Sequence, residues 1–139
     1  MKMDKARKKT DRLLRDLERR VKAVYSSDPS LLRIQKRLDV YMASVAEATK
    51  SEYDAYKSAD GMDEKRRLKK IYGDKVRSLT LNCKPYKDLV AEYTRIMAIV
   101  NQKALDLVNA EMAQIYTINY NAVADDCKAV GIHVEKSDG

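Results

Sequence analysis

The longest uninterrupted apolar pattern in this chain runs from Tyr86 to Asn121, directly after Pro85. The segment contains no proline or glycine. Its apolar residues recur at steps of three or four, at Leu89/Val90, Tyr93, Ile96/Met97, Val100, Ala104, Leu107/Val108, Met112 and Ile115/Tyr116. This spacing predicts a single long amphipathic helix. At about 1.5 Å per residue the helix extends roughly 50 Å, more than the diameter of a small domain, so the rest of the chain must pack along it.

Three shorter segments also show helical patterns. Residues 4–25 place leucine and valine on one face, and the sequence SDPS at 27–30 ends that helix, because its proline disfavours helical geometry in the preceding residue. Residues 31–48 space their apolar side chains by 3, 4, 3, 4 and 3, the 3.5-residue period of a coiled-coil seam. This pattern weakens until SADG at 58–61, whose glycine offers a C-cap. A further helix is expected over 62–79.

The composition agrees with long, solvated helices. The chain is 35% charged and 45% hydrophobic, and it has nine tyrosines but neither phenylalanine nor tryptophan. The sequence therefore predicts an all-α fold, an elongated bundle of about four helices with one long C-terminal helix over about 86–120. We expect a single helical domain over 1–139, in which the basic segment 1–12 and the tail 131–139 are flexible.

The net charge of +7 lies at one end of the chain. Residues 1–40 hold 13 Lys/Arg against 6 Asp/Glu, whereas residues 41–139 hold 15 of each. Candidate contacts to nucleic acid or to an acidic partner are Lys5, Lys8, Lys9, Arg12, Arg15 and Arg19. Against this interpretation, acidic residues alternate with the basic ones at helix-stabilising spacing, and no aromatic residue precedes Tyr25 to stack on bases.

The sequence shows no pattern typical of catalysis, a metal site or a cofactor site. Cys83 and Cys127 form no C-x-x-C pair, which favours a reducing compartment, and the single histidine, His133, has no nucleophile beside it in the sequence. We therefore expect no enzyme activity, no cofactor and no bound metal. No apolar run is long enough to span a bilayer, so no membrane is expected among the partners.

Polar and aromatic residues gather near the end of the long helix, in IYTINYN. Tyrosine is enriched at the cores of protein interfaces, and lysine is depleted there. The candidate protein-binding residues are Asn109, Tyr116, Asn119, Tyr120 and Asn121. The alternative is structural, with asparagine capping the helix and tyrosines at the edge of a helix contact.

Three stretches resemble one known family. KTDRLLRDLERRVKAVY, EYDAYKSADGMDEKRR and VNQKALDLVNAEMAQIYTINYN are similar to the N-terminal helical region of tailed-phage minor capsid (Mu-F-like head morphogenesis) proteins. The similarity covers most of residues 8–121. The positions that match the family's closing pattern are Asn101, Ala104, Asn109, Tyr116, Asn119 and Asn121. Members of the family continue into a further C-terminal domain, whereas this sequence stops at Gly139, which leaves a short variant, a fragment or a different family as alternatives.

The resemblance implies a structural component of a phage head that works near the portal vertex through protein contacts. Its implied partners are other head proteins, portal or capsid, with nonspecific DNA contact by the basic N-terminus. The implied location is the virion head, after synthesis in the host cytoplasm. The coiled-coil seam of 31–48 and the length of the last helix also suggest a homo-oligomer. The alternative function is a cytosolic helical accessory protein that binds nucleic acid through its basic N-terminus.

Overall fold

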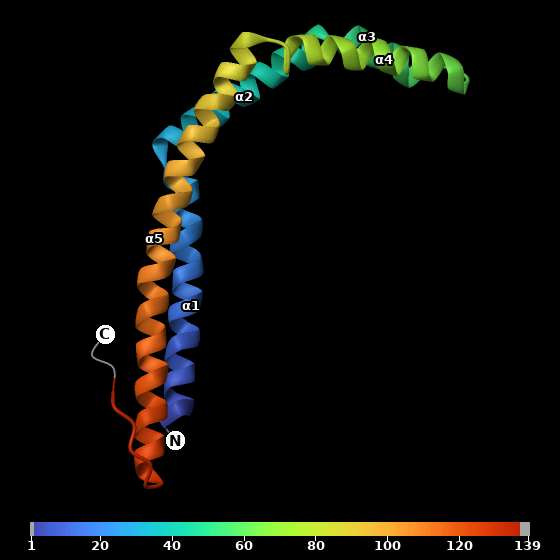
Figure 1. The fold of residues 1–139 in the computed structure, drawn as a ribbon. Coiled ribbons are helices and arrows are strands. Elements are labelled where there is room, and N and C mark those ends of the chain that lie inside the picture. The colour runs from blue at the N-terminus through green and yellow to red at the C-terminus, as the bar shows by residue number, and fades with distance from the viewer. Residues whose placement is uncertain (1, 137–139) are drawn as a thin grey trace. The chain divides into compact units, whose positions relative to one another are not determined.

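A computed structural model of the protein describes residues 2–136. Its described part contains five helices and no strand: α1 (Lys2–Ser27), α2 (Pro29–Ala48), α3 (Lys50–Ser58), α4 (Met62–Leu79) and α5 (Lys84–Ala129). The predicted all-α class and the long C-terminal helix are confirmed (Figure 1). The chain has one helix more than the expected four, because the second predicted helix is divided at Thr49.

The packing divides the chain into two compact units. Unit 1 combines the described parts of residues 1–28 and 99–139, and unit 2 is residues 29–98. Helix α5 contributes its first turns to unit 2 and the rest to unit 1. Within each unit a helix buries its apolar side chains against its own antiparallel partner, so the two units have separate cores.

Unit 1 is an antiparallel pair of helices, α1 and the C-terminal part of α5, which lie side by side in Figure 1. The buried residues are mostly small: Ala6, Thr10 and Leu17 on α1, and Val100, Ala104, Ile115, Ala122 and Ala124 on α5. Alanine and threonine let two helix backbones approach closely, which makes the contact tight but thin. Polar pairs border it, including Arg20 with Glu111 at 2.8 Å and Tyr25 Oη with Asn101 Oδ1 at 2.6 Å.

Helix α1 begins at Lys2 and so includes residues 2–12, most of the basic segment for which the sequence predicted flexibility. The reason lies on α5. The carboxylate of Asp126 accepts hydrogen bonds from the backbone N–H groups of Lys2 (3.2 Å) and Met3 (3.1 Å), and Asp125 pairs with the Lys2 ammonium at 3.2 Å. The first N–H groups of a helix have no partner within the helix. Here the neighbouring helix α5 supplies their hydrogen-bond acceptors, and sequence spacing does not reveal such a contact.

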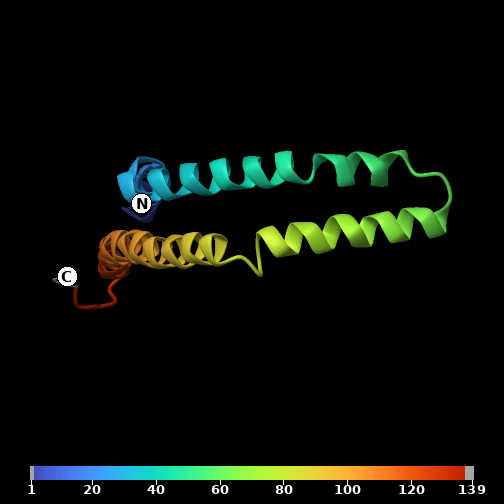
Figure 2. The ribbon, with the colours of Figure 1, turned by 90° about the horizontal axis from the view of Figure 1, so that it is seen from above.

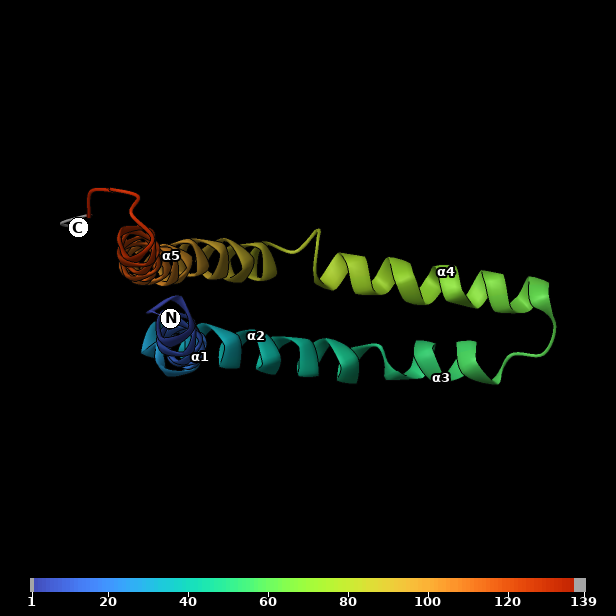
Figure 3. The same ribbon diagram turned by 90° about the horizontal axis from the view of Figure 1, so that it is seen from below.

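Unit 2 consists of two antiparallel rows of helix. Helices α2 and α3 form one row, and α4 with the first turns of α5 forms the other (Figures 2 and 3). The apolar core comprises Leu31, Ile34, Val45 and Ile96. The outer part is held by Tyr53 against Tyr72, with ring centroids 5.4 Å apart, and by an ion pair of 2.7 Å between Lys75 and Glu52. The hydrogen bond from Lys75 lowers the pKa of Glu52.

The break between α2 and α3 and the turn between α3 and α4 have local causes. Thr49 lies between α2 and α3 and is buried. Its hydroxyl donates a hydrogen bond to the Val45 carbonyl at 2.8 Å, a type of contact that bends helices. The glycine at 61 was expected to cap the preceding helix, and this is wrong. The C-cap is Ala59, and Gly61 instead opens α4 with φ of 86°, a left-handed conformation that glycine adopts without strain.

Helix α5 continues eight residues beyond Asn121, to Ala129, because Ala122 and Ala124 are still buried in unit 1. Gly131, at φ of 88°, follows the helix end, and residues 132–136 are not helical. Lys136 returns to Asp125 at 2.7 Å. The rest of the predicted tail, 137–139, lies outside the described residues.

The two adjacent leucines at the start of α2 allow a matched test of the unit 2 core. Leu31 is 1% exposed and Leu32 is 48% exposed. We expect Leu31→Ala to lower the free energy of unfolding by about 2–4 kcal/mol, because it removes buried methylenes and leaves a cavity. Leu32→Ala should cost less than about 1 kcal/mol. Chemical denaturation followed by circular dichroism measures both, and equal losses would contradict the assigned core.

The ion pairs of Asp125 predict a pH dependence in unit 1. The ammonium groups of Lys136 and Lys2 lower the pKa of Asp125 in the folded chain. The stabilisation is therefore present above the ordinary aspartate pKa and is lost as pH falls through the lowered value. We expect Asp125→Asn to melt at a lower temperature than the wild type near neutral pH, and the difference to shrink as the solution is acidified towards pH ~2. A difference that is constant with pH would contradict this role. Asp39→Asn, at an exposed side chain on α2, is the control.

Candidate interaction surfaces

The predicted basic cluster forms a stripe on the outer face of α1. Lys5, Lys8, Arg12, Arg15 and Arg19 are all exposed and follow one another at steps of 3, 4, 3 and 4, so they share one side of the helix. This side is opposite the buried Ala6, Thr10 and Leu17. The sixth candidate, Lys9, is exposed but lies away from this line. We call the five aligned residues, Lys5, Lys8, Arg12, Arg15 and Arg19, the basic stripe.

Few carboxylates neutralise the basic stripe. Arg19 pairs with Asp16 at 2.8 Å, and the nearby Lys22 pairs with Glu18 at 3.5 Å. The side chains of Lys5, Lys8, Arg12 and Arg15 are all exposed. A shallow depression on this side is lined by Arg12, Arg15, Glu18, Arg19 and Lys22. The stripe can therefore accept several anionic groups along roughly 20 Å of helix.

The five predicted interface residues are only partly brought together. Asn109, Tyr116 and Asn119 are exposed on one side of α5. Tyr120 stacks on Tyr116, with ring centroids 6.0 Å apart. Asn121 is half-buried, and at two residues from Asn119 it points to a different side of the helix.

Three apolar residues on the same side of α5 were not identified from the sequence as a separate surface. Leu105, Met112 and Val123 are 51%, 43% and 39% exposed. The sequence pattern placed Met112 and Tyr116 within the buried stripe of the helix. In the structure Ile115 is buried, Tyr116 is 66% exposed, and Glu111 takes the position beside α1 through its pair with Arg20. The signal available in the sequence was a second line of residues with a 3.5-residue period, offset along α5 from the line that is buried.

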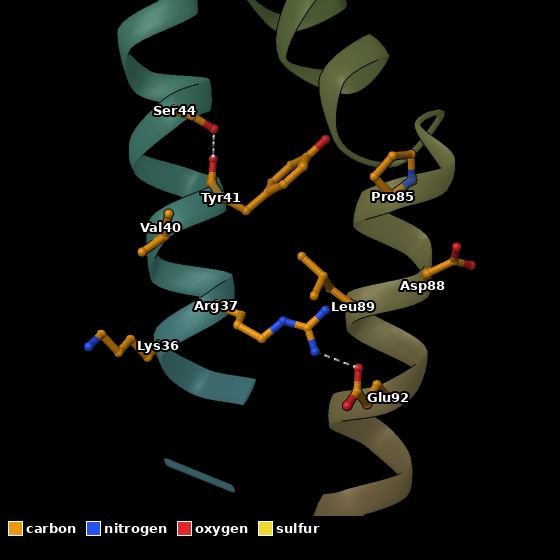
Figure 4. A pocket seen from close by; sticks show the side chains of 9 residues that line it. All are labelled: Lys36, Arg37, Val40, Tyr41, Ser44, Pro85, Asp88, Leu89 and Glu92. Carbon is orange, nitrogen blue, oxygen red and sulfur yellow. Dashed lines mark hydrogen bonds and ion pairs between the residues drawn. The ribbon is translucent and has the colours of Figure 1, made fainter. Parts of the chain in front are cut away.

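Unit 2 carries an open groove between α2 and the start of α5, shown in Figure 4. Its lining residues are Lys36, Arg37, Val40, Tyr41, Ser44, Pro85, Asp88, Leu89 and Glu92. Arg37 and Glu92 form an ion pair of 3.0 Å across it. The Tyr41 hydroxyl donates to the Leu79 carbonyl and contacts the Cys83 sulfur at 3.2 Å. The Cys83 contact, together with burial, raises the pKa of Tyr41. The Arg37–Glu92 pair joins α2 to α5, and the Tyr41 contacts join α2 to the end of α4 and to the turn before α5.

The remaining chemistry of the described residues is limited. No group of three or more His, Cys, Asp or Glu side chains in the range 2–136 is arranged to hold a metal ion. His133 is exposed beyond the end of α5. None of the helices over these residues is both long and apolar enough to cross a membrane.

Comparison with known proteins adds no relative. No protein family model, curated protein or solved structure matches this chain.

Proposed function

We propose that this protein is a structural or assembly component of a tailed-phage head, a minor capsid protein near the portal vertex that acts through protein contacts. Two observations support the proposal. One is the resemblance of residues 8–121 to the helical region of such proteins. The other is the exposed side of α5, where half-exposed apolar residues alternate with Asn109, Tyr116 and Asn119.

The exposed side of α5 is the observation that carries the general function. Soluble chains rarely expose a contiguous line of large apolar side chains without a partner. Tyrosine, methionine and leucine beside asparagine amides give a surface with both apolar area and hydrogen-bonding groups, as protein interfaces have. Binding to another protein is therefore the activity this surface supports best.

The genes that flank the coding sequence test the phage-head context. We expect portal, terminase and scaffold or major capsid genes beside it, and we expect mass spectrometry of purified heads to detect the chain. Deleting the gene should reduce the yield of filled heads seen by electron microscopy, whereas tails should still form. Chromosomal housekeeping neighbours, or heads that lack the chain, would contradict the proposal.

The basic stripe favours a second candidate function, an accessory protein that binds nucleic acid. Lysines and arginines on one exposed helix face neutralise phosphates without reading sequence. The same stripe also suits DNA contact inside a phage head, so this activity is compatible with the first proposal.

Charge reversal within the basic stripe tests nucleic-acid binding. We expect Arg12→Glu with Arg15→Glu to weaken duplex DNA binding at low salt by at least about tenfold, and to lower the slope of log affinity against log salt by about two, since two phosphate contacts are lost. Arg66→Glu with Lys69→Glu, two exposed residues at the same spacing on α4, is the matched control. Fluorescence anisotropy across a salt series measures both. Wild-type binding that does not change with salt, or equal effects of the two pairs, would exclude the stripe as a DNA site.

A further inference from the structure

The exposed side of α5 in unit 1 has a regular order. Its residues follow one another at steps of 4, 3, 4, 3 and 4, the heptad spacing of a coiled-coil seam. We call them the outer seam: Leu105, Asn109, Met112, Tyr116, Asn119 and Val123. The four apolar members are between 39% and 66% exposed, and both asparagines are exposed. The outer seam is separate from the buried line of Val100, Ala104, Ile115 and Ala122 that contacts α1.

The outer seam reads the same in both directions: apolar, asparagine, apolar, apolar, asparagine, apolar. Turned end over end, it places Leu105 opposite Val123, Asn109 opposite Asn119, and Met112 opposite Tyr116. An antiparallel coiled coil brings together these same positions, since each layer pairs an a residue of one helix with a d residue of the other. A two-fold axis requires a surface that matches itself in this way.

We propose that α5 of one copy packs antiparallel against α5 of a second copy through the outer seam. In this pairing the side-chain amide of Asn109 in one copy forms hydrogen bonds with the side-chain amide of Asn119 in the second copy. This asparagine layer lies between apolar layers. Sliding the helices by one heptad places an asparagine opposite Met112 or Tyr116 and leaves its amide unpaired. Buried asparagines fix the register of coiled coils through this cost. In a parallel pair each residue faces the same residue of the other copy, whatever the sequence is. A parallel pairing therefore does not explain why the outer seam reads the same in both directions.

Helix α1 supplies a further apolar residue at the centre of the proposed interface. Leu14 is 41% exposed. The pairs of Arg20 with Glu111 and of Lys2 with Asp125 place Leu14 at the level of Met112 to Tyr116. Met3, three turns before Leu14 on the same face of α1, shares a depression with Val123, so this face borders the outer seam.

The area is that of a modest but specific interface. The outer seam and Leu14 together expose on the order of 500 Å² per copy, so pairing removes on the order of 1,000 Å² from water, near the lower limit for specific complexes. Two helices enclose only a thin core, whereas two copies of unit 1 provide the four helices of a bundle. The pairing does not depend on the phage-head context.

Sedimentation equilibrium of the full chain measures the pairing directly. We expect the wild type to have twice the 15.9 kDa mass of one chain at micromolar concentration. Met112→Glu should raise the dimer dissociation constant at least about tenfold, since it places a carboxylate in an apolar layer. Met42→Glu on α2 is the matched control, because Met42 is 42% exposed and Met112 is 43% exposed. Circular dichroism verifies that both variants remain helical.

A compensating pair of charges tests the direction and the register. Tyr116→Lys alone should also weaken the dimer. Combined with Met112→Glu, it should restore most of the affinity, because in the antiparallel register each glutamate faces a lysine of the second copy. In a parallel pair, like charges meet and the double variant stays dissociated.

Three results would each overturn the proposal. The first is a monomeric wild type at up to about 100 μM, a concentration at which even weak specific pairs assemble. The second is a dimer that Met112→Glu and Met42→Glu weaken equally. The third is a double variant that dissociates as readily as the single variants.

Discussion

The close contact between α1 and α5 is the interaction on which unit 1 depends. It is made largely by small side chains, Ala6 and Thr10 on one helix and Ala104 and Ala122 on the other. Small side chains let the backbones approach, but they bury little apolar area, and hydrophobic stabilisation is roughly proportional to that area. The polar pairs beside this contact therefore matter for alignment. Asp125 and Asp126 hold the first turn of α1, and Glu111 holds Arg20.

A thin core has a direct consequence for function. Because each helix buries only one narrow line of side chains, larger apolar residues remain outside it. On α5 these are the apolar members of the outer seam, and they share their side of the helix with Asn109 and Asn119. Unit 1 therefore presents two different surfaces, the basic stripe on the outside of α1 and the outer seam on α5. The first suits anionic groups, and the second suits another helix.

The candidate sites were predictable to different degrees. Five of the six basic candidates lie on one face of α1. Their spacing was readable from the sequence, since residues at steps of three and four share a side of a helix whatever surrounds them. The interface residues were harder to place. Tyr116 and Met112 fit the apolar period of α5 as well as Ile115 does, and only the position of α1 shows that Ile115 is buried while the other two are exposed. The start of α1 likewise depends on Asp126, which lies 124 residues from Lys2.

The sequence by itself determined the all-α class, the breaks near Pro29 and Gly61, and the long helix after Pro85. These features follow from backbone geometry and local apolar spacing, which act over a few residues. Only the tertiary structure decided the division into two units, the bend at Thr49, the helical state of residues 2–12 and the identity of the outer seam. Each of these depends on which face of one helix meets another helix. A helix with two apolar lines leaves that choice open until its partner is in place.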